Sequence, residues 1–380
     1  MHGRVFGEGR KVRLRLLDVE ACAQALEGVA MEIEDCYSEV VTEVVTTSDP
    51  EVAFDGADVA VLLGGFPRLP GMERRDLIAK NAPIMAEHGR ALAKCAAKGV
   101  RVLVVANPAC TNCLIASTSA PSIPRSQFSS LARLDQDRLS AMLAKKISSK
   151  EFPVMTSESS TATATTEQPS DTELLRGKNR DVKRGNDGSH EQQVLLPSRI
   201  GVRGVYLWGN HSPTMWPDVS KAEAKIGDRW VPVKEIVLHA AHKAANTEEN
   251  LTTTAVSAWE KWLTKTLVPA VRGRGTKVIE TRGKSSALSA ANAIANHLRD
   301  WLSCTTGERE AVSMGVYSDG NPYGVPEGLV YSFPVECGEG RHRILGGLCP
   351  EEAMLEASTQ ELIEERREAL ETLRDLGLQT

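Results

Sequence analysis

The stretch Ala57-Asp58-Val59-Ala60-Val61-Leu62-Leu63-Gly64-Gly65 decides the fold class of this chain. A short apolar run without alternation is typical of a strand that is buried on both faces of a parallel sheet, and two glycines end it. A helix is predicted next, over residues 76–98, and then a second buried strand over Val100–Ala106. Strands that alternate with helices predict an α/β fold with a parallel sheet.

Length and composition set the class of protein. The chain has 380 residues, of which 41% are hydrophobic and 25% are charged, and this composition predicts a soluble globular protein of two domains. A formal net charge of -5 gives no reason to expect a nucleic acid partner. No apolar run approaches the roughly 20 residues that a membrane helix needs, so we expect no membrane partner.

The eight cysteines are scattered along the chain. Cys110 and Cys113 have C-x-x-C spacing, but no second pair completes a zinc site. Scattered cysteines of this kind favour reduced thiols in a cytoplasmic protein, and we expect no bound metal.

A candidate general base follows the β-rich run Val205–Trp208. Gly209 and Asn210 are turn formers that end the predicted strand, so His211 comes just past its end, where α/β proteins place their chemistry. A neutral imidazole with a pKa near 6.5 can take and return a proton at physiological pH. The alternative is a histidine that merely caps the strand.

The stretch Leu131–Arg138 holds the charges that such a base would need. Asp135 and Arg138 lie on the same side of a predicted helix because of their i, i+3 spacing. Asp135 could orient His211 and stabilise its protonated form, and Arg138 could bind a substrate carboxylate through two N–H groups. A solvated salt bridge is the alternative.

Residues 64–74 form a predicted loop with two further cations. Arg68 and Arg74 stand among prolines and glycines, which suits a mobile segment that closes over an anionic substrate. A solvated surface is again the alternative.

An acidic residue ends the first predicted strand, Lys11–Asp18. In a dinucleotide-binding fold, a carboxylate at this place accepts hydrogen bonds from the adenosine ribose and repels a 2′-phosphate. Asp18 therefore favours NAD over NADP.

Seven segments follow one another in the order of a known family. The chain resembles malate dehydrogenase of the cytosolic type, within the lactate/malate dehydrogenase superfamily, through most of its length. The segments that carry the resemblance are GMERRDLIAKN (71–81), NPACTNCLIAS (107–117), SAPSIP (119–124), LARLDQDR (131–138), WGNHSPTMWPD (208–218), KSSALSAA (284–291) and MGVYSDGNPYGVP (314–326).

The resemblance implies two domains and a homodimer. A doubly wound Rossmann-type NAD domain without its first strand is expected at 1–128, and an α+β catalytic domain at 129–380. The polar stretch at about 148–199 is too poor in apolar residues to offset its ordering entropy, so it is predicted to be a disordered insertion. A shorter insertion is predicted at about 237–258. The helix at 25–35 matches one that makes dimer contacts, although its apolar face could equally be core.

The resemblance also implies NAD-dependent oxidation of malate to oxaloacetate, with His211 as general base and Asp135 beside it. Arg68 would face a second carboxylate, which favours malate over lactate. The positions that match substrate contacts are Arg68, Arg74, Asn107, Arg138 and Ser285. The positions that match cofactor contacts are Asp18, Gly64, Asn81, His88, Val105, Ala106 and Asn107.

The chain departs from the family before its first predicted strand. The family begins with a strand, a glycine-rich turn and a helix, and about ten residues are too few for these. Two interpretations remain. The chain is a shortened form of a working enzyme, or it is an inactive paralogue that serves as a partner-binding scaffold. The first is favoured because the catalytic motifs have stayed together.

Overall fold

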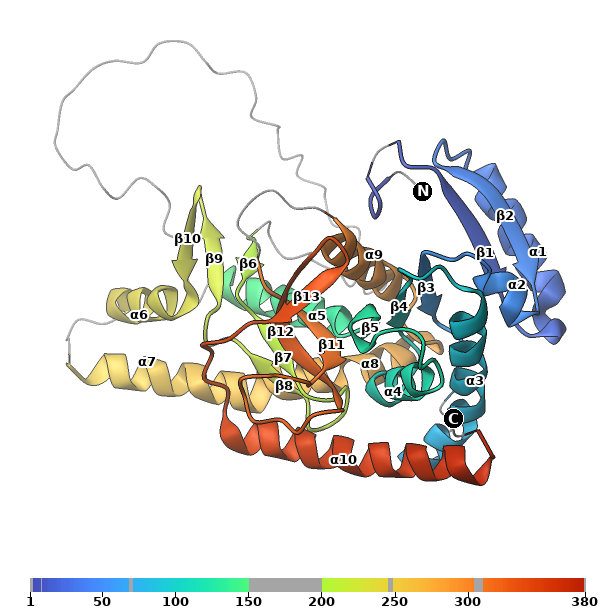
Figure 1. Ribbon diagram of the computed structural model, residues 1–380. Helices are drawn as coiled ribbons and strands as arrows, with labels where there is room; N and C mark the ends of the chain where they lie inside the picture. Colours follow the sequence, from blue (N-terminus) through green and yellow to red (C-terminus); the bar gives the residue numbers. More distant parts are fainter. Residues whose placement is uncertain are drawn as a thin grey trace, which may run out of the picture.

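The computed structural model describes residues 3–7, 9–67, 71–149, 200–244, 249–303 and 310–378, and it describes the backbone alone for 241–244 and 249–255. Arg68 and nearly all of the insertion predicted at about 148–199 lie outside these residues. The described strands form a six-stranded sheet, in the order β13-β12-β11-β5-β4-β3, and three smaller sheets (Figure 1).

The parallel half of the large sheet contains the strands that the apolar runs predicted. β3 (Val59–Leu62), β4 (Arg101–Val104) and β5 (Phe128–Ser130) pair in parallel. Between them run α3 (Arg74–Cys95) and α4 (Ala109–Thr118), which pack against each other. The alternation of parallel strands with helices confirms the predicted α/β fold.

The other half of the large sheet comes from the C-terminal part of the chain and is antiparallel. β11 (Val312–Tyr317) pairs with β5 and with β12 (Val330–Gly338), and β13 (Arg341–Ile344) follows. At the junction, a Cβ on Gly315 would lie 1.8 Å from Ser130 Oγ, so the close approach of these strands requires glycine. One sheet therefore spans the predicted domain boundary, which the sequence did not predict.

A separate parallel pair stands beside the large sheet. β1 (Val12–Leu17) pairs with β2 (Val41–Thr47), and α1 (Ala23–Asp35) packs on them (Figure 1, blue). Within the described residues, β1 and β3 each have hydrogen-bonded strand neighbours on one side only. This arrangement agrees with a doubly wound sheet that has no strand between these two.

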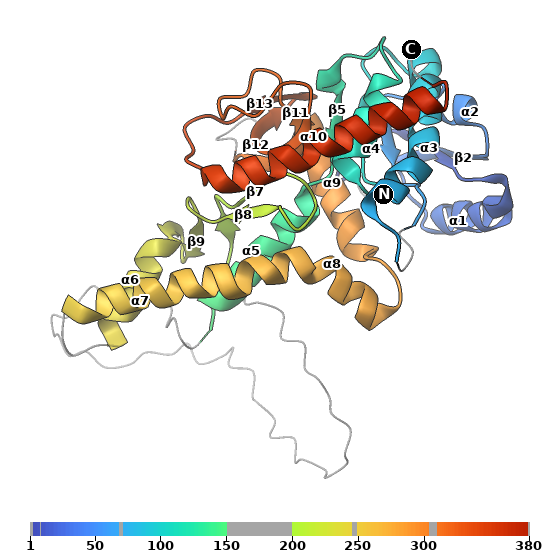
Figure 2. The ribbon, with the colours of Figure 1, turned by 90° about the horizontal axis from the view of Figure 1, so that it is seen from below.

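The C-terminal part contains one long helical run. α7 (Glu249–Trp262) passes through a π-helical turn at Leu263–Leu267 into α8 (Val268–Arg282), as Figure 2 shows. The segment predicted as a second insertion is helical in α6 and α7, and His239 of α6 is exposed. The other elements are η1 (Glu20–Cys22), α2 (Pro50–Phe54), η2 (Arg125–Gln127), α5 (Arg133–Ile147), β6 (Val202–Arg203), β7 (Tyr206–Trp208), β8 (Trp216–Asp218), β9 (Glu223–Ile226), β10 (Arg229–Pro232), α6 (Val233–Ala244) and α9 (Leu288–Leu302).

Two apolar clusters hold these elements together. The larger surrounds the six-stranded sheet, and the smaller joins α5, β7 and α8. The last helix, α10 (Glu352–Asp375), lies across α3 and α4 and contributes Leu362, Ala369 and Leu373 to the larger cluster (Figure 2). None of the described helices is both long and apolar enough to cross a membrane.

Candidate active site

The turn after β7 positions His211. Gly209 exchanges backbone hydrogen bonds of 3.1 and 2.9 Å with Ser332 of β12, and its φ of +89° ends the strand. A Cβ on Gly209 would lie 2.1 Å from Ser358 Oγ of α10, so glycine is required there. The imidazole therefore projects from a backbone that is anchored to the large sheet.

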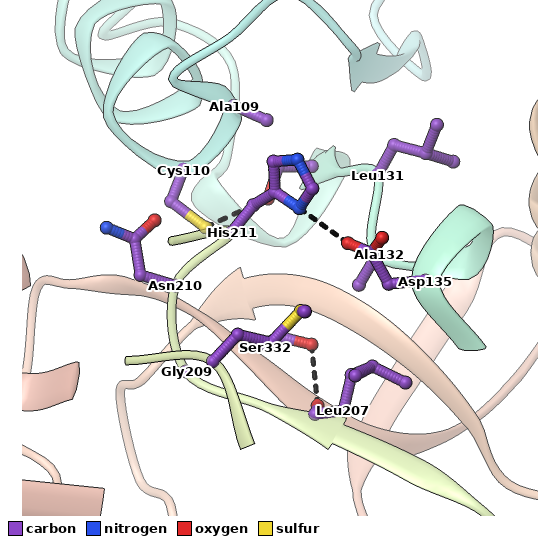
Figure 3. A pocket seen from close by; sticks show the side chains of 12 residues that line it. Ala109, Cys110, Leu131, Ala132, Asp135, Leu207, Gly209, Asn210, His211 and Ser332 are labelled. Atoms are coloured by element: carbon purple, nitrogen blue, oxygen red, sulfur yellow. Dashed lines mark hydrogen bonds and ion pairs between the residues drawn. The ribbon is translucent and has the colours of Figure 1, made fainter. Parts of the chain in front are cut away.

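Asp135 and His211 point toward each other, and a dashed line joins them in Figure 3. His211 Nδ1 and Asp135 Oδ2 are 2.5 Å apart, and Arg138 Nη1 donates to Asp135 Oδ1 over 2.8 Å. The Asp135 side chain is 5% exposed, whereas that of His211 is 37% exposed. The carboxylate is thus buried behind the imidazole, whose outer edge reaches solvent.

The charges of this cluster shift the pKa values of its members. The Asp135 carboxylate raises the pKa of His211, against the opposing effects of burial, Arg138 and Arg74. Burial pushes the pKa of Asp135 upward, but His211 and Arg138 outweigh it, so the net pKa is lowered. Asp135 is therefore a carboxylate that favours the protonated form of His211.

Arg138 points from α5 toward the start of α9. Its Nη2 donates to Ser286 Oγ over 3.2 Å, and a Cβ on Gly275 of α8 would lie 3.8 Å from its Nη1. The predicted Ser285 is exposed, and its carbonyl accepts a hydrogen bond from Arg282. The hydroxyl next to Arg138 is therefore that of Ser286, one residue beyond the matched position.

Arg74 is the first residue of α3 and forms an ion pair with Glu365 of α10 through its Nε. Glu365 also accepts hydrogen bonds from Thr111 and from Asn210. The sequence analysis did not single out Glu365. A signal was present, because this acidic residue shares one helical face with three buried apolar residues, Leu362, Ala369 and Leu373.

A pocket in front of His211 combines apolar walls with a few polar groups. Burial raises the pKa of the Cys110 thiol to about 11, so this thiol stays protonated near neutral pH. Ser130, Asn210, Met215 and Ser332 are pocket residues that sequence reasoning missed. The pocket is lined by Ala109, Cys110, Ser130, Leu131, Ala132, Asp135, Leu207, Gly209, Asn210, His211, Met215 and Ser332 (Figure 3).

The carboxyl ends of β3 and β4 contain most of the predicted cofactor residues. Asn81 is buried, accepts from the backbone N–H of Phe66 over 2.7 Å and donates to the carbonyl of Asn107 over 3.3 Å. The backbone N–H groups of Val105 and Ala106 both donate to the carbonyl of Leu62. Asn81 therefore joins the two strand ends and shapes the loops that follow them.

The ends of β1 and β3 fit the adenosine side of a dinucleotide. Asp18 is exposed at the end of β1, and nothing lies within 4 Å of a Cβ built on Gly64. An exposed carboxylate and an open backbone are what a ribose and its phosphates require.

The predicted cofactor residue His88 lies in α3. Its ring packs edge-on against Phe54 at 5.7 Å, and burial lowers its pKa. In the described residues, no group of three metal-ligating side chains occurs.

Two family models match this chain. The model of the lactate/malate dehydrogenase NAD binding domain matches residues 4–129. The model of the lactate/malate dehydrogenase alpha/beta C-terminal domain matches residues 236–373.

Individual proteins match along nearly the whole chain. Cytoplasmic malate dehydrogenases from Homo sapiens and Felis catus are 38% and 37% identical to it over 376 residues, covering 98% of this chain and 92% of theirs. A malate dehydrogenase structure from Naegleria fowleri superposes with a TM-score of 0.72 at 34% identity, over 98% of this chain and 92% of that one. A Trichomonas vaginalis lactate dehydrogenase in complex with NADH and oxamate gives 0.73 at 27% identity, over 98% and 93%.

Proposed function

This chain belongs to the lactate/malate dehydrogenase family, and we propose that it catalyses the reversible oxidation of (S)-malate to oxaloacetate. Membership of the family makes it an oxidoreductase with NAD as cofactor. The observation that carries the proposal is the cluster of His211, Asp135 and Arg138, in which a base, its orienting carboxylate and a cation meet at one pocket.

His211 would act through Nε2. Because Nδ1 faces Asp135 at 2.5 Å, the Nδ1–H donates to the carboxylate, and Nε2 keeps its lone pair for the hydroxyl proton of malate. As the imidazole gains that proton, the adjacent carboxylate stabilises its positive charge. The bound nicotinamide supplies the acceptor for the hydride that leaves C2.

The arginines would orient the substrate. Arg138 would bind the C1 carboxylate in a bidentate manner, with the hydroxyl of Ser286 or of the matched Ser285 beside it. Arg74 would polarise the oxygen at C2, which gains negative charge when oxaloacetate is reduced. Asn107, at the end of β4, would bridge substrate and nicotinamide, since an amide donates and accepts at once.

Arg68 would select the second carboxylate of malate. This assignment rests on its place in the predicted loop 64–74 and on the resemblance to the family, because Arg68 lies outside the described residues. An unpaired guanidinium at the C3 end of the substrate would be costly, so lactate and pyruvate would bind poorly. We expect Arg68→Gln to shift the preference of the enzyme from oxaloacetate toward pyruvate. An unchanged ratio of kcat/KM values for these two substrates would refute the role of Arg68.

The remaining assignments also come from the resemblance to the family, and we propose them on that ground. NAD would be held by Asp18 at the ribose and by the backbone at Gly64, and the other matched cofactor positions are Asn81, His88, Val105, Ala106 and Asn107. The domain division near 128/129, a homodimer and a cytoplasmic location would follow the family and its cytoplasmic relatives.

The test is calorimetric titration of this chain with NAD, together with oxidation of NADH by oxaloacetate. We expect binding and turnover. Binding without turnover would refute the catalytic assignments. No binding would favour the scaffold interpretation, which the enzyme relatives do not support.

A further inference from the structure

We infer that Glu365 of α10 is a positioning residue, which holds the guanidinium of Arg74 beside the turn that carries His211. The inference rests on the proposed function, because it takes Arg74 as the group that polarises the C2 oxygen. It assigns a role in the reaction to the C-terminal helix α10, which holds none of the site residues that the sequence predicted.

Glu365 joins three elements of the site. Its Oε1 accepts from Arg74 Nε of α3 and, over 2.8 Å, from Asn210 Nδ2 of the turn before His211. Its Oε2 accepts from Thr111 Oγ1 of α4. The two oxygens of one carboxylate therefore connect Arg74 at the start of α3, the neighbour of the proposed general base and the helix beside the pocket.

Burial makes this carboxylate sensitive to its partners. The Glu365 side chain is 5% exposed, and among the described residues its cationic partner is Arg74. A buried carboxylate needs hydrogen bonds and a counter-charge, and removal of one partner leaves the other uncompensated. The ion pair therefore keeps Arg74 inside the protein, although Arg74 is 27% exposed and begins a helix that follows a loop.

The contact uses Nε and leaves a terminal nitrogen of the guanidinium for other interactions. Glu365 binds Nε, and within the described residues no acceptor lies within hydrogen-bonding distance of the buried Arg74 Nη2. Asp135 raises the pKa of His211, and the charge of Arg74 is among the influences that oppose this rise, so Arg74 acts on the region around His211. Because planar guanidinium donors have a fixed geometry, an anchor at Nε determines where the remaining donors point.

Helix α10 makes a second contact, with the residues that follow His211. Glu361 Oε2 accepts from Ser212 Oγ over 2.5 Å and from Thr214 Oγ1 over 2.6 Å. This contact holds the turn, and among the described residues its partners are hydroxyl groups rather than cations. Glu365 is therefore the residue of α10 through which a change would reach Arg74.

The test is Glu365→Gln, which keeps the size of the side chain and removes its charge. We expect kcat/KM for oxaloacetate to fall by about 10- to 100-fold, chiefly through kcat. The reason is that the contact between Arg74 and the C2 oxygen strengthens as this oxygen gains charge. In an Arg74→Gln background, the same change should cost less than about twofold, because the group it acts through is gone. Glu365→Asp, which restores the charge, should recover part of the loss.

A matched control is Glu364→Gln, which removes the same charge from the exposed face of α10, where Glu364 accepts from Gln360 over 3.2 Å. It should leave kcat/KM unchanged. Equal losses from Glu365→Gln in both Arg74 backgrounds would mean a structural role and overturn the inference. An increase in kcat/KM would overturn it too, because Glu365 would then compete with the substrate for Arg74.

A second readout does not need turnover. Phenylglyoxal modifies accessible arginines, and its reaction with Arg74 can be followed by peptide mass spectrometry. Glu365→Gln should accelerate this reaction several-fold, and Glu364→Gln should not. If the wild-type chain fails to reduce oxaloacetate, the proposed function fails, and the modification rates still decide whether Glu365 holds Arg74. Unchanged rates would refute the inference.

Discussion

The six-stranded sheet and the β1–β2 pair support the two halves of the proposed site in different ways. The catalytic half rests on a sheet whose strands are largely buried, and His211 follows a glycine that is hydrogen-bonded to β12. Asp18 instead stands at the exposed end of β1, and no residue of β1, α1 or β2 is fully buried. Regions that bury less apolar surface open more readily, so cofactor affinity and catalytic geometry should be separable in this protein.

The sharpest test of that separation is His211→Ala. Loss of the general base should lower turnover by about 10³- to 10⁴-fold, while the dissociation constant for NAD changes by less than about twofold. Steady-state kinetics and calorimetry measure the two quantities. A loss of NAD binding would mean that His211 has a structural role and that the two halves are coupled.

Two core substitutions compare the sheets directly. Phe333 of β12 is fully buried in the larger cluster, whereas Leu16 of β1 is partly exposed. Phe333→Ala should lower the free energy of unfolding by about 3–5 kcal/mol, and Leu16→Ala by about 1 kcal/mol, because the second change leaves a smaller cavity. Urea denaturation gives both values. Similar losses would show that the β1–β2 pair is packed as firmly as the large sheet.

Asp135→Asn tests the electrostatics of the catalytic half. The Asp135 carboxylate is the main cause that raises the pKa of His211, while burial, Arg138 and Arg74 lower it. In the proposed mechanism malate oxidation needs neutral His211, so its rate should fall as the pH drops through that pKa. Without the carboxylate the pKa decreases, and the acid limb of the pH–rate profile should move to lower pH, with a plateau about 10²-fold lower. An acid limb at the same pH would contradict this origin of the pKa.

The smallest expected effect concerns the cofactor half of the proposed site, on β1. Asp18→Ala should weaken NAD binding by about tenfold through the lost ribose hydrogen bonds. It should leave kcat unchanged and shift the free energy of unfolding by less than about 0.5 kcal/mol, because Asp18 is exposed. A large fall in kcat at saturating NAD would show that β1 does influence the catalytic geometry.

Local sequence was sufficient for the elements and for part of the cluster. Apolar runs predicted β3 and β4, and the i, i+3 spacing predicted that Asp135 and Arg138 share a helix face, which the 2.8 Å contact between them confirms. These features depend on residues that are close along the chain. Long motifs then identified the family, which the family models and relatives confirm.

Contacts between distant segments were beyond such reasoning. The pairing of Gly315 with Ser130 depends on how two remote strands approach each other, and the hydroxyl beside Arg138 turned out to be that of Ser286 because α9 begins at Leu288. A sequence motif predicts which residue makes a contact only to within one or two positions along the chain. Packing decides which side chain makes the contact.

By itself, the sequence determined the α/β fold and the family, and it singled out His211 and Asp135 as candidates, because periodicity and motifs are properties of neighbouring residues. The tertiary structure alone decided that one sheet would run through both halves, that β1 and β2 would form a separate pair, and that Glu365 of the last helix would bind Arg74. Those outcomes depend on which buried polar and apolar groups find partners across the fold, and this is settled only when the whole chain packs.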